Sequence, residues 1–196
     1  MSRAATASMR RILGSAAGSA AAHGSQSVAP AARPVASGRR RMLASMTDVP
    51  PVVVSVDLPV PPATAYAAFV ARFADWWPGA THSLSRDAAT RCRLDATPGG
   101  VVEERGPDGS CHRWGTVESV EPGRRLRFTW HPGREPESAQ WVDVEFLASG
   151  AGTRVTLTHG GWDALGEIAP ILRREYQGGW QHLLEAVYSE FVVRSN

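Results

Sequence analysis

The sequence predicts an α+β domain in which a curved antiparallel sheet wraps around a long C-terminal helix. Three features of the chain predict this fold. Between Thr90 and His159 the sequence is a series of short strand patterns separated by turns. One strand pattern and one helix pattern precede this series, and an amphipathic helix pattern follows it. Strands that are grouped together, rather than alternating with helices, favour an antiparallel sheet with helices packed on one face.

The first two elements are a strand and a helix. Apolar and polar residues alternate in residues 52–58, VVVSVDL, with the period of a half-buried strand. Residues 59–79 open with prolines and continue as a helix, which Pro78 and Gly79 end. The apolar face of this helix is formed by residues three and four apart, namely Tyr66, Phe69, Val70 and Phe73.

The strand series is divided by turn sequences at residues 97–100, 106–110, 121–123, 131–137 and 149–152. This spacing predicts a meander of about six strands. Residues 125–130, RLRFTW, place Leu126, Phe128 and Trp130 on one face, opposite Arg125, Arg127 and Thr129. Residues 141–146 alternate in the same way, with Val142, Val144 and Phe146 on one face. One face of the sheet is therefore expected to be in contact with solvent.

The last element is a long helix with an apolar stripe. Its apolar residues recur at helical spacing, at Trp180, Leu183, Leu184, Val187, Phe191 and Val192. Polar residues such as Gln181 and Glu185 fall outside that stripe. A sheet wrapped around this helix encloses either a packed core or a cavity.

The amino-acid composition excludes several classes of protein. A chain of 196 residues with 43% hydrophobic content can bury one good core. All 21 basic residues are arginine, which excludes lysine-dependent Schiff-base chemistry and a phosphate-loop lysine. Residues 1–47 hold seven arginines and no acid, so the remainder carries 14 arginines against 19 acids, a net charge of −5. We therefore expect no nucleic-acid partner, and the absence of a long apolar run predicts no membrane span.

The chain is expected to divide into a leader, residues 1–47, and a folded domain, residues 48–196. The leader is rich in Ala, Ser, Gly and Arg, which is typical of disorder and of organelle transit peptides. A start at Met42 or Met46, with the preceding sequence not part of the functional protein, is a third hypothesis. We expect a cytoplasmic protein, or an organelle protein if the leader is a transit peptide.

Several motifs occur in the order found in a known family. They are FADWWPG (73–79), GGVVEE (99–104), RWGTVESVEPGRRLRFTW (113–130), VTLTHGGW (155–162) and YQGGWQHLLEAV (176–187). Over residues 52–192 the chain resembles the activator of heat-shock protein 90 ATPase homologue-like family, within the START/Bet v 1-like (SRPBCC) superfamily. This resemblance implies a helix-grip fold, which agrees with the pattern above. It also implies ligand binding, or a stress-response role beside a chaperone, but no single activity.

The candidate site lies where the sheet faces the C-terminal helix. In residues 154–159 the alternation places Val155, Leu157 and His159 on one face, so the imidazole points inward. Tryptophans 76, 77, 114, 162 and 180 are expected to line the same seam, with Glu118 as a further polar contact. The predicted ligand-binding residues are Trp76, Trp77, Trp114, Phe128, Trp130, Phe146, His159, Trp180 and Leu184. For each of them core packing is the alternative interpretation.

Motifs for catalysis are missing. HGG at residues 159–161 resembles an esterase oxyanion loop, but the chain has no G-x-S-x-G. It has no H-E-x-x-H, phosphate loop or dinucleotide fingerprint either. Five histidines of the folded part are scattered, and Cys92 and Cys111 fit no zinc pattern, so both are expected to be inert free thiols. We predict no metal, no cofactor and no catalytic residue.

Three hypotheses for function remain. The first is a non-catalytic domain, monomeric or weakly dimeric, that binds an apolar or aromatic small molecule of unspecified identity. The second is a co-chaperone that stimulates the heat-shock protein 90 ATPase. The third is a cyclase- or aromatase-like enzyme that uses His159.

Overall fold

The computed structural model describes residues 49–196, and the expected leader, residues 1–47, lies outside them. Seven antiparallel strands form one curved sheet in the order β1-β7-β6-β5-β4-β3-β2. The strands are β1 Val52–Leu58, β2 Arg91–Leu94, β3 Val101–Arg105, β4 Cys111–Glu121, β5 Arg125–Trp130, β6 Gln140–Ser149 and β7 Gly152–Gly160. The meander expected between residues 90 and 159 is therefore confirmed, and β1 closes the sheet by pairing with β7.

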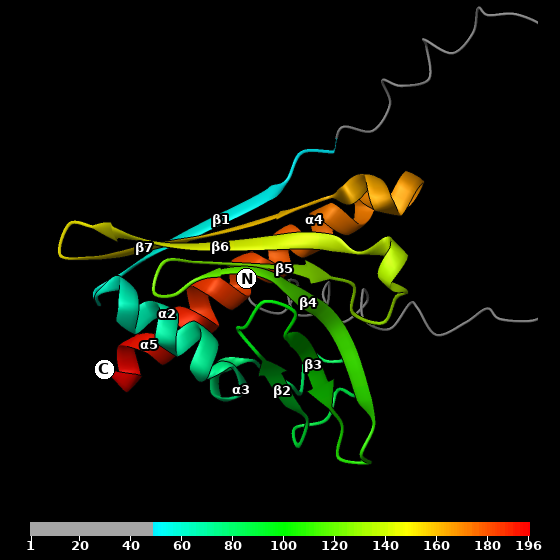
Figure 1. Cartoon of the computed structure of the whole chain (residues 1–196), viewed down its shortest axis with the longest axis horizontal. Helices are drawn as coiled ribbons and strands as arrows, with labels where there is room; N and C mark the ends of the chain where they lie inside the picture. Colours follow the sequence, from blue (N-terminus) through cyan, green and yellow to red (C-terminus); the bar gives the residue numbers. More distant parts are fainter. Residues whose placement is uncertain (1–48) are drawn as a thin grey trace, which may run out of the picture.

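The helices lie on the concave side of the sheet (Figure 1). They are α2 Pro62–Ala71, α3 Phe73–Trp76, α4 Ala169–Gln181, η3 His182–Tyr188 and α5 Ser189–Ser195, with short 3-10 turns η1 Pro136–Ser138 and η2 Trp162–Ile168. The α+β prediction of a curved sheet around a long C-terminal helix is confirmed. Among residues 49–196, no helix combines the length and the apolar character needed to cross a membrane.

The helix expected over residues 59–79 forms in two parts. Pro62 occupies the first turn of α2, where its missing N–H is not needed. Arg72 leaves helical geometry, with φ −113° and ψ 26°, and α3 begins after it. Phe69 and Phe73 are buried as expected, whereas Tyr66 and Val70 are only partly buried.

The C-terminal helix departs from regular spacing at η3, which is a π-helix of seven residues. A π-helix takes more residues per turn than an α-helix, so the buried stripe changes phase. Leu184, Tyr188 and Val192, four apart, are buried, whereas Val187 and Phe191, which were predicted on the stripe, are only partly buried. The expected stripe is therefore wrong at Val187 and Phe191, whereas the burial of Trp180, Leu183, Leu184 and Val192 confirms it at those four positions.

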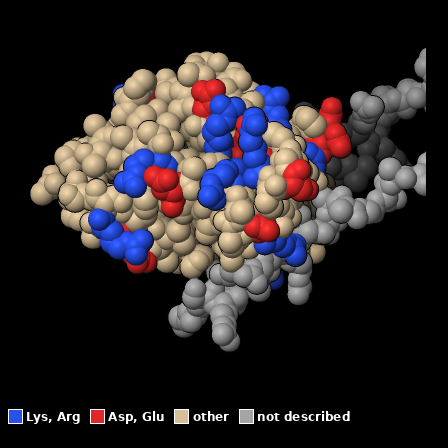
Figure 2. All heavy atoms as spheres, turned by 90° about the horizontal axis from the view of Figure 1, so that it is seen from below, with Lys and Arg blue, Asp and Glu red and all other residues tan. Residues whose placement is uncertain are grey.

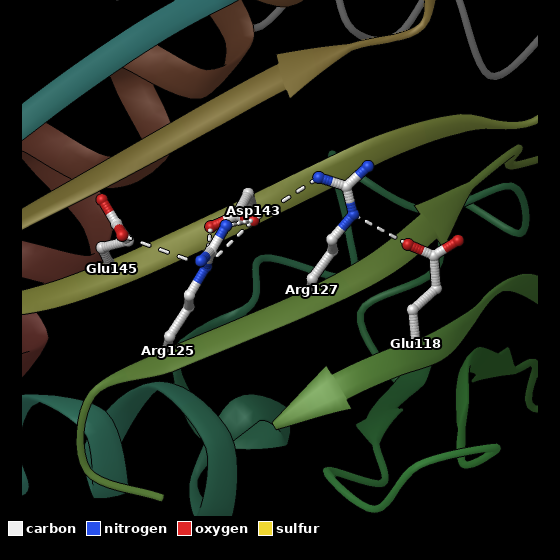
Figure 3. Close-up of polar contacts among 5 residues, drawn as sticks. All are labelled: Glu118, Arg125, Arg127, Asp143 and Glu145. Atoms are coloured by element: carbon white, nitrogen blue, oxygen red, sulfur yellow. Dashed lines mark hydrogen bonds and ion pairs between the residues drawn. The ribbon is translucent and has the colours of Figure 1, made fainter. Parts of the chain in front are cut away.

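The outer face of the sheet carries paired charges (Figure 3). Arg125 donates to both carboxylate oxygens of Asp143, at 2.7 and 3.0 Å for the two closest contacts. Arg127 lies 3.7 Å from the same carboxylate and donates to Glu118 at 2.9 Å. This face is the one opposite Leu126, Phe128 and Trp130, as the alternation predicted.

Glu118 is consequently not a polar contact of the seam, and that expectation is wrong. Strict alternation from the inward Trp114 would place Glu118 inward as well. Trp114 and Val117 are three apart and both buried, so the alternation changes phase between them, where the β3–β4 register skips Trp114, and Glu118 is exposed. A bulge of this kind changes which residues face the core.

Candidate ligand-binding site

Four tryptophans from four separate elements meet between the sheet and the C-terminal helix. Trp77 follows α3, Trp114 lies in β4, Trp130 ends β5 and Trp180 lies in α4. The Trp77 ring centroid is 5.4 Å from that of Trp114, 5.9 Å from that of Trp130 and 6.1 Å from that of Trp180. Trp130 is 5.5 Å from Trp114 and 5.4 Å from Trp180. We call these four residues the tryptophan cluster; all are buried, and their rings pack against one another.

The other predicted site residues divide between two parts of the core. Phe128 contacts Trp130 at 5.9 Å between ring centroids, so it adjoins the tryptophan cluster. Trp76 donates its N–H to the carbonyl of Phe69 and packs against Tyr188, and Phe146 also packs on Phe69. These contacts place Trp76 and Phe146 near α2. Leu184 is buried in η3.

His159 lies at the end of β7 with its side chain fully buried, pointing inward as the alternation predicted. Trp180 donates its indole N–H to His159 Nδ1 at 2.9 Å, and Trp162 donates its N–H to the His159 carbonyl at 3.0 Å. Because Nδ1 accepts a hydrogen bond, the proton of the neutral ring is on Nε2. Burial lowers the pKa of His159 well below its ordinary value, and the charge of Arg134 acts in the same direction. The imidazole is therefore neutral near pH 7.

A row of buried polar atoms in this region lacks hydrogen-bond partners among residues 49–196. The atoms are the indole nitrogens of Trp114 and Trp130, Nε2 of His159 and the hydroxyl of Tyr176. Their rings are linked by close contacts, since His159 lies 4.8 Å from Tyr176 and 6.1 Å from Trp180, which contacts Trp130. Buried polar groups of folded proteins are nearly always paired. The region therefore contains four buried N–H or O–H groups that form no hydrogen bond with any described residue.

Tyr176 was missed by the sequence reasoning. It lies four residues before Trp180, so helical spacing alone places both side chains on one face of α4. Its ring is fully buried against His159 and Trp162, at 4.8 and 5.6 Å between centroids. The four-residue spacing from Trp180, within the motif YQGGWQHLLEAV, was the signal that could have identified Tyr176.

The chemistry that this arrangement supports is hydrogen-bond donation. His159 Nδ1 is occupied by Trp180 and Nε2 carries a proton, so neither nitrogen is free to accept a proton from a ligand. No group of three or more His, Cys, Asp or Glu suited to a metal ion occurs in residues 49–196. His131, interpreted as a turn residue, bonds through Nδ1 to the Arg134 carbonyl. Cys92 and Cys111 are both free thiols, and burial raises the pKa of Cys92 far above its ordinary value, with Glu104 adding to the effect.

The curved seven-stranded sheet and the long C-terminal helix define a helix-grip domain of the START/Bet v 1-like class. Residues 59–191 match the family model described as Activator of Hsp90 ATPase homolog 1-like protein. The chain belongs to this family, which confirms the resemblance found in its motifs. Comparison with curated protein sequences gave no match.

Three solved structures illustrate the likeness. A protein from Mesorhizobium loti is 16% identical, with a TM-score of 0.57, over 74% of this chain and 98% of its own. DynU16, from the dynemicin biosynthetic locus, is 20% identical with a TM-score of 0.54, over 74% of this chain; the match spans 48% of DynU16. Txn09, an anthrahydroquino-gamma-pyrone synthase solved in complex with a ligand, is 27% identical with a TM-score of 0.52, over 73% of this chain and 97% of its own. The first two show the fold alone.

Proposed function

We propose that this domain binds a planar, largely apolar small molecule that carries hydrogen-bond acceptors, and that it binds this ligand at the tryptophan cluster. The observation that carries the proposal is the row of unpartnered donors on Trp114, Trp130, His159 and Tyr176. Each buried donor without a partner costs about 1–3 kcal/mol, which a ligand oxygen in reach would recover. Indole faces would contact the ring system of the ligand.

The ligand would take the place now filled by Trp77. Trp77 is the member of the tryptophan cluster that belongs neither to the sheet nor to the long helix. Its N–H donates to the carbonyl of His82 at 2.7 Å, within the connection that leads to β2. Displacing Trp77 together with this connection would expose Trp114, Trp130 and Trp180 to an incoming aromatic ring.

The comparison with Txn09 supports the ligand class. At 27% identity over 97% of its chain, Txn09 is named for an anthrahydroquino-gamma-pyrone, a fused ring system that carries oxygen substituents. Such a molecule offers both the flat surface and the acceptors that the donors of the seam require. We propose binding without catalysis, because His159 is protonated on Nε2 and occupied on Nδ1, which suits it to orient a ligand oxygen rather than to remove a proton.

The second candidate is a co-chaperone function, which membership of the Hsp90 ATPase activator-like family favours. Addition of the purified protein to heat-shock protein 90 would then raise ATP turnover, and unchanged turnover over a range of ratios would exclude it. For either function we propose a cytoplasmic protein that acts as a monomer or weak dimer.

Two matched probes test ligand binding to the full chain by isothermal titration calorimetry. Anthraquinone-2-sulfonate and anthracene-2-sulfonate share a tricyclic shape and a charge, but only the quinone has two ring carbonyls. We expect micromolar binding of the quinone and at least about tenfold weaker binding of the hydrocarbon, as two hydrogen bonds of about 1 kcal/mol imply. Equal binding of the two, or binding of neither, would contradict the proposal.

Variants locate the site. Trp130→Phe keeps an aromatic ring and removes one donor, so quinone affinity should fall about fivefold while hydrocarbon affinity is unchanged. The control is Trp141→Phe on the outer face, where the indole packs on Arg127 instead, and it should leave both affinities unchanged. A loss of the same size in both variants would place the ligand elsewhere.

A further inference from the structure

Four arginines gather on the outer face of β2, β3 and β4. Between β2 and β3, Arg91 lies opposite Arg105, and Arg93 lies opposite Glu103. Between β3 and β4, Glu103 lies opposite Arg113. Figure 2 shows basic side chains grouped on the face seen from below, where β2, β3 and β4 lie in Figure 1. The group departs from the overall acidity of residues 48–196, which carry 14 arginines against 19 acids.

Only one carboxylate neutralises this group. Glu103 lies 3.2 Å from Arg93 and 3.4 Å from Arg105, and among the described residues neither Arg91 nor Arg113 forms an ion pair. Burial raises the pKa of Glu103, but the hydrogen bond from Cys111 and the charges of Arg93 and Arg105 outweigh it and lower the pKa. Glu103 is therefore ionised at neutral pH. Together, the four arginines and this one glutamate carry a net charge of +3.

Other arginines of the outer face differ, because each has its own carboxylate. Arg154 donates to Asp57 at 2.7 and 2.9 Å, and Arg125 donates to Asp143. An excess of positive charge is therefore specific to the β2–β4 end of the sheet. Arg91 donates only to the backbone carbonyls of Ala89 and Thr90, at 3.3 and 3.4 Å, and Arg93 and Arg105 share the single charge of Glu103, so these exposed arginines favour a further, external anion.

A groove of about 280 Å³ runs beside these arginines. One wall is formed by β2 together with Arg105, and it brings the side chains of Arg91 and Arg93 to the rim. The other wall comes from the end of α2 and from α3, and it is apolar, with Val70, Ala71, Phe73 and Ala74. An apolar groove with a cationic rim suits a ligand that has both an apolar side chain and negative charges beside it.

We propose that this groove and the arginines at its rim dock an acidic segment of a partner protein, with an apolar side chain in the groove and flanking carboxylates on Arg91, Arg93 and Arg105. A nucleic acid fits less well, since the arginines span only three strands, about 10 Å, and the rest of the domain is acidic. The groove shares no residue with the tryptophan cluster, although Phe73 in its wall stacks on Trp77 at 5.0 Å between ring centroids. The test below uses a peptide and does not depend on the ligand proposed for the tryptophan cluster.

Fluorescence anisotropy with a labelled heptapeptide, EDEFEDE, and the full chain tests the proposal. We expect saturable binding that weakens as salt is added, and about tenfold weaker binding for QNQFQNQ or for EDESEDE. Binding of EDESEDE as tight as that of EDEFEDE would overturn the role of the groove. A single-stranded DNA oligonucleotide or phosphatidylserine vesicles binding more tightly than the peptide would overturn the choice of partner.

Two sets of variants separate a site from general attraction. The triple change Arg91→Gln, Arg93→Gln and Arg105→Gln should weaken peptide binding about tenfold or more. Its control removes the same charge from exposed, paired arginines, at Arg124→Gln, Arg154→Gln and Arg194→Gln, and should weaken binding less than about twofold. Equal losses in the two triples would show that only net charge matters and would refute the site.

A single substitution in the apolar wall of the groove tests peptide binding without changing any arginine. Ala74 is exposed on the apolar wall, so Ala74→Glu places a carboxylate in the groove without disturbing the core. We expect about fivefold or greater loss of peptide binding with an unchanged unfolding transition. Retained affinity in this folded variant would also refute docking in the groove.

Discussion

Trp180 donates its indole N–H to Nδ1 of His159 across 2.9 Å, and this bond joins the C-terminal helix to the end of β7. It fixes both the position and the tautomer of a fully buried imidazole. It also turns the remaining proton, on Nε2, toward a part of the core where no described residue accepts it.

The neutral state of His159 makes stability depend on pH. Its pKa is lower in the folded protein than in the unfolded chain, so the unfolded chain binds more protons as the pH falls below about 6.5, and stability falls with it. Between pH 7 and pH 5 we expect the wild type to lose about 2 kcal/mol more than His159→Gln, whose amide keeps an acceptor for Trp180. Urea unfolding at the two pH values measures this difference. Identical pH dependence in the two proteins would show that the pKa of His159 is the same in the folded protein as in the unfolded chain.

Trp77 fills the centre of the tryptophan cluster. Replacing it with Ala removes contacts to three other tryptophans and should cost about 3–5 kcal/mol in the free energy of unfolding. Indole added to Trp77→Ala should enter the space and raise the Tm, and it should not change the Tm of the wild type. If indole leaves the Tm of the variant unchanged, the neighbouring side chains have collapsed into the space and cannot admit a ring.

Two buried tyrosines provide a matched comparison. The Tyr188 hydroxyl donates to the carbonyl of Ala65 at 2.5 Å and thereby ties η3 to α2, whereas the Tyr176 hydroxyl has no partner among residues 49–196. Tyr188→Phe should cost about 1 kcal/mol, because it removes a buried hydrogen bond between η3 and α2. Tyr176→Phe should be neutral or slightly stabilising, and should weaken quinone binding. Denaturant unfolding of both variants measures these effects, and an equal cost at the two positions would mean that Tyr176 has a partner.

Glu104 holds the connection that follows Trp77. Its fully buried carboxylate accepts bonds from the backbone N–H of Leu84 at 2.7 Å and from the N–H and hydroxyl of Ser85 at 2.9 and 2.6 Å. Glu104→Gln would turn a donor toward one of these donors and should cost about 2–4 kcal/mol. Hydrogen exchange should accelerate at the amides of Leu84 and Ser85.

The control for Glu104→Gln is Glu137→Gln at an exposed position of η1, which should change neither stability nor exchange. If hydrogen exchange at Leu84 and Ser85 is unaltered in Glu104→Gln, this carboxylate does not hold the connection that is proposed to move with Trp77.

Local patterns in the sequence were enough to predict the sheet and its two faces. The alternation in residues 125–130 and 154–159 assigned Trp130 and His159 to the inner face, and the burial of both side chains confirms it. Alternation works here because a strand has a period of two wherever its pairing is regular. Between Trp114 and Val117 a bulge in β4 breaks that regularity, and the Glu118 side chain lies on the solvent face instead.

Distant contacts determined the remaining features. The π-helix η3 brings Tyr188 rather than Val187 to the core, and helical periodicity has no signal for that change. Glu104 was not singled out, because its partners lie 19 and 20 residues earlier in the chain. The role of the predicted seam residues in ligand binding stays a prediction; the structure directs attention to the donors on three of them, Trp114, Trp130 and His159, and adds Tyr176.

By itself, the sequence determined the order of the elements, the inward face of each regular strand and the family. These follow from residue types and short-range spacing. Tertiary structure alone decided that Trp180 occupies Nδ1 of His159, that four tryptophans from different elements share one space, and that three arginines border one groove. The physical reason is that hydrogen-bond partners, tautomers and burial depend on residues brought together from separate elements, whose relative positions are set only when the sheet closes around the helix.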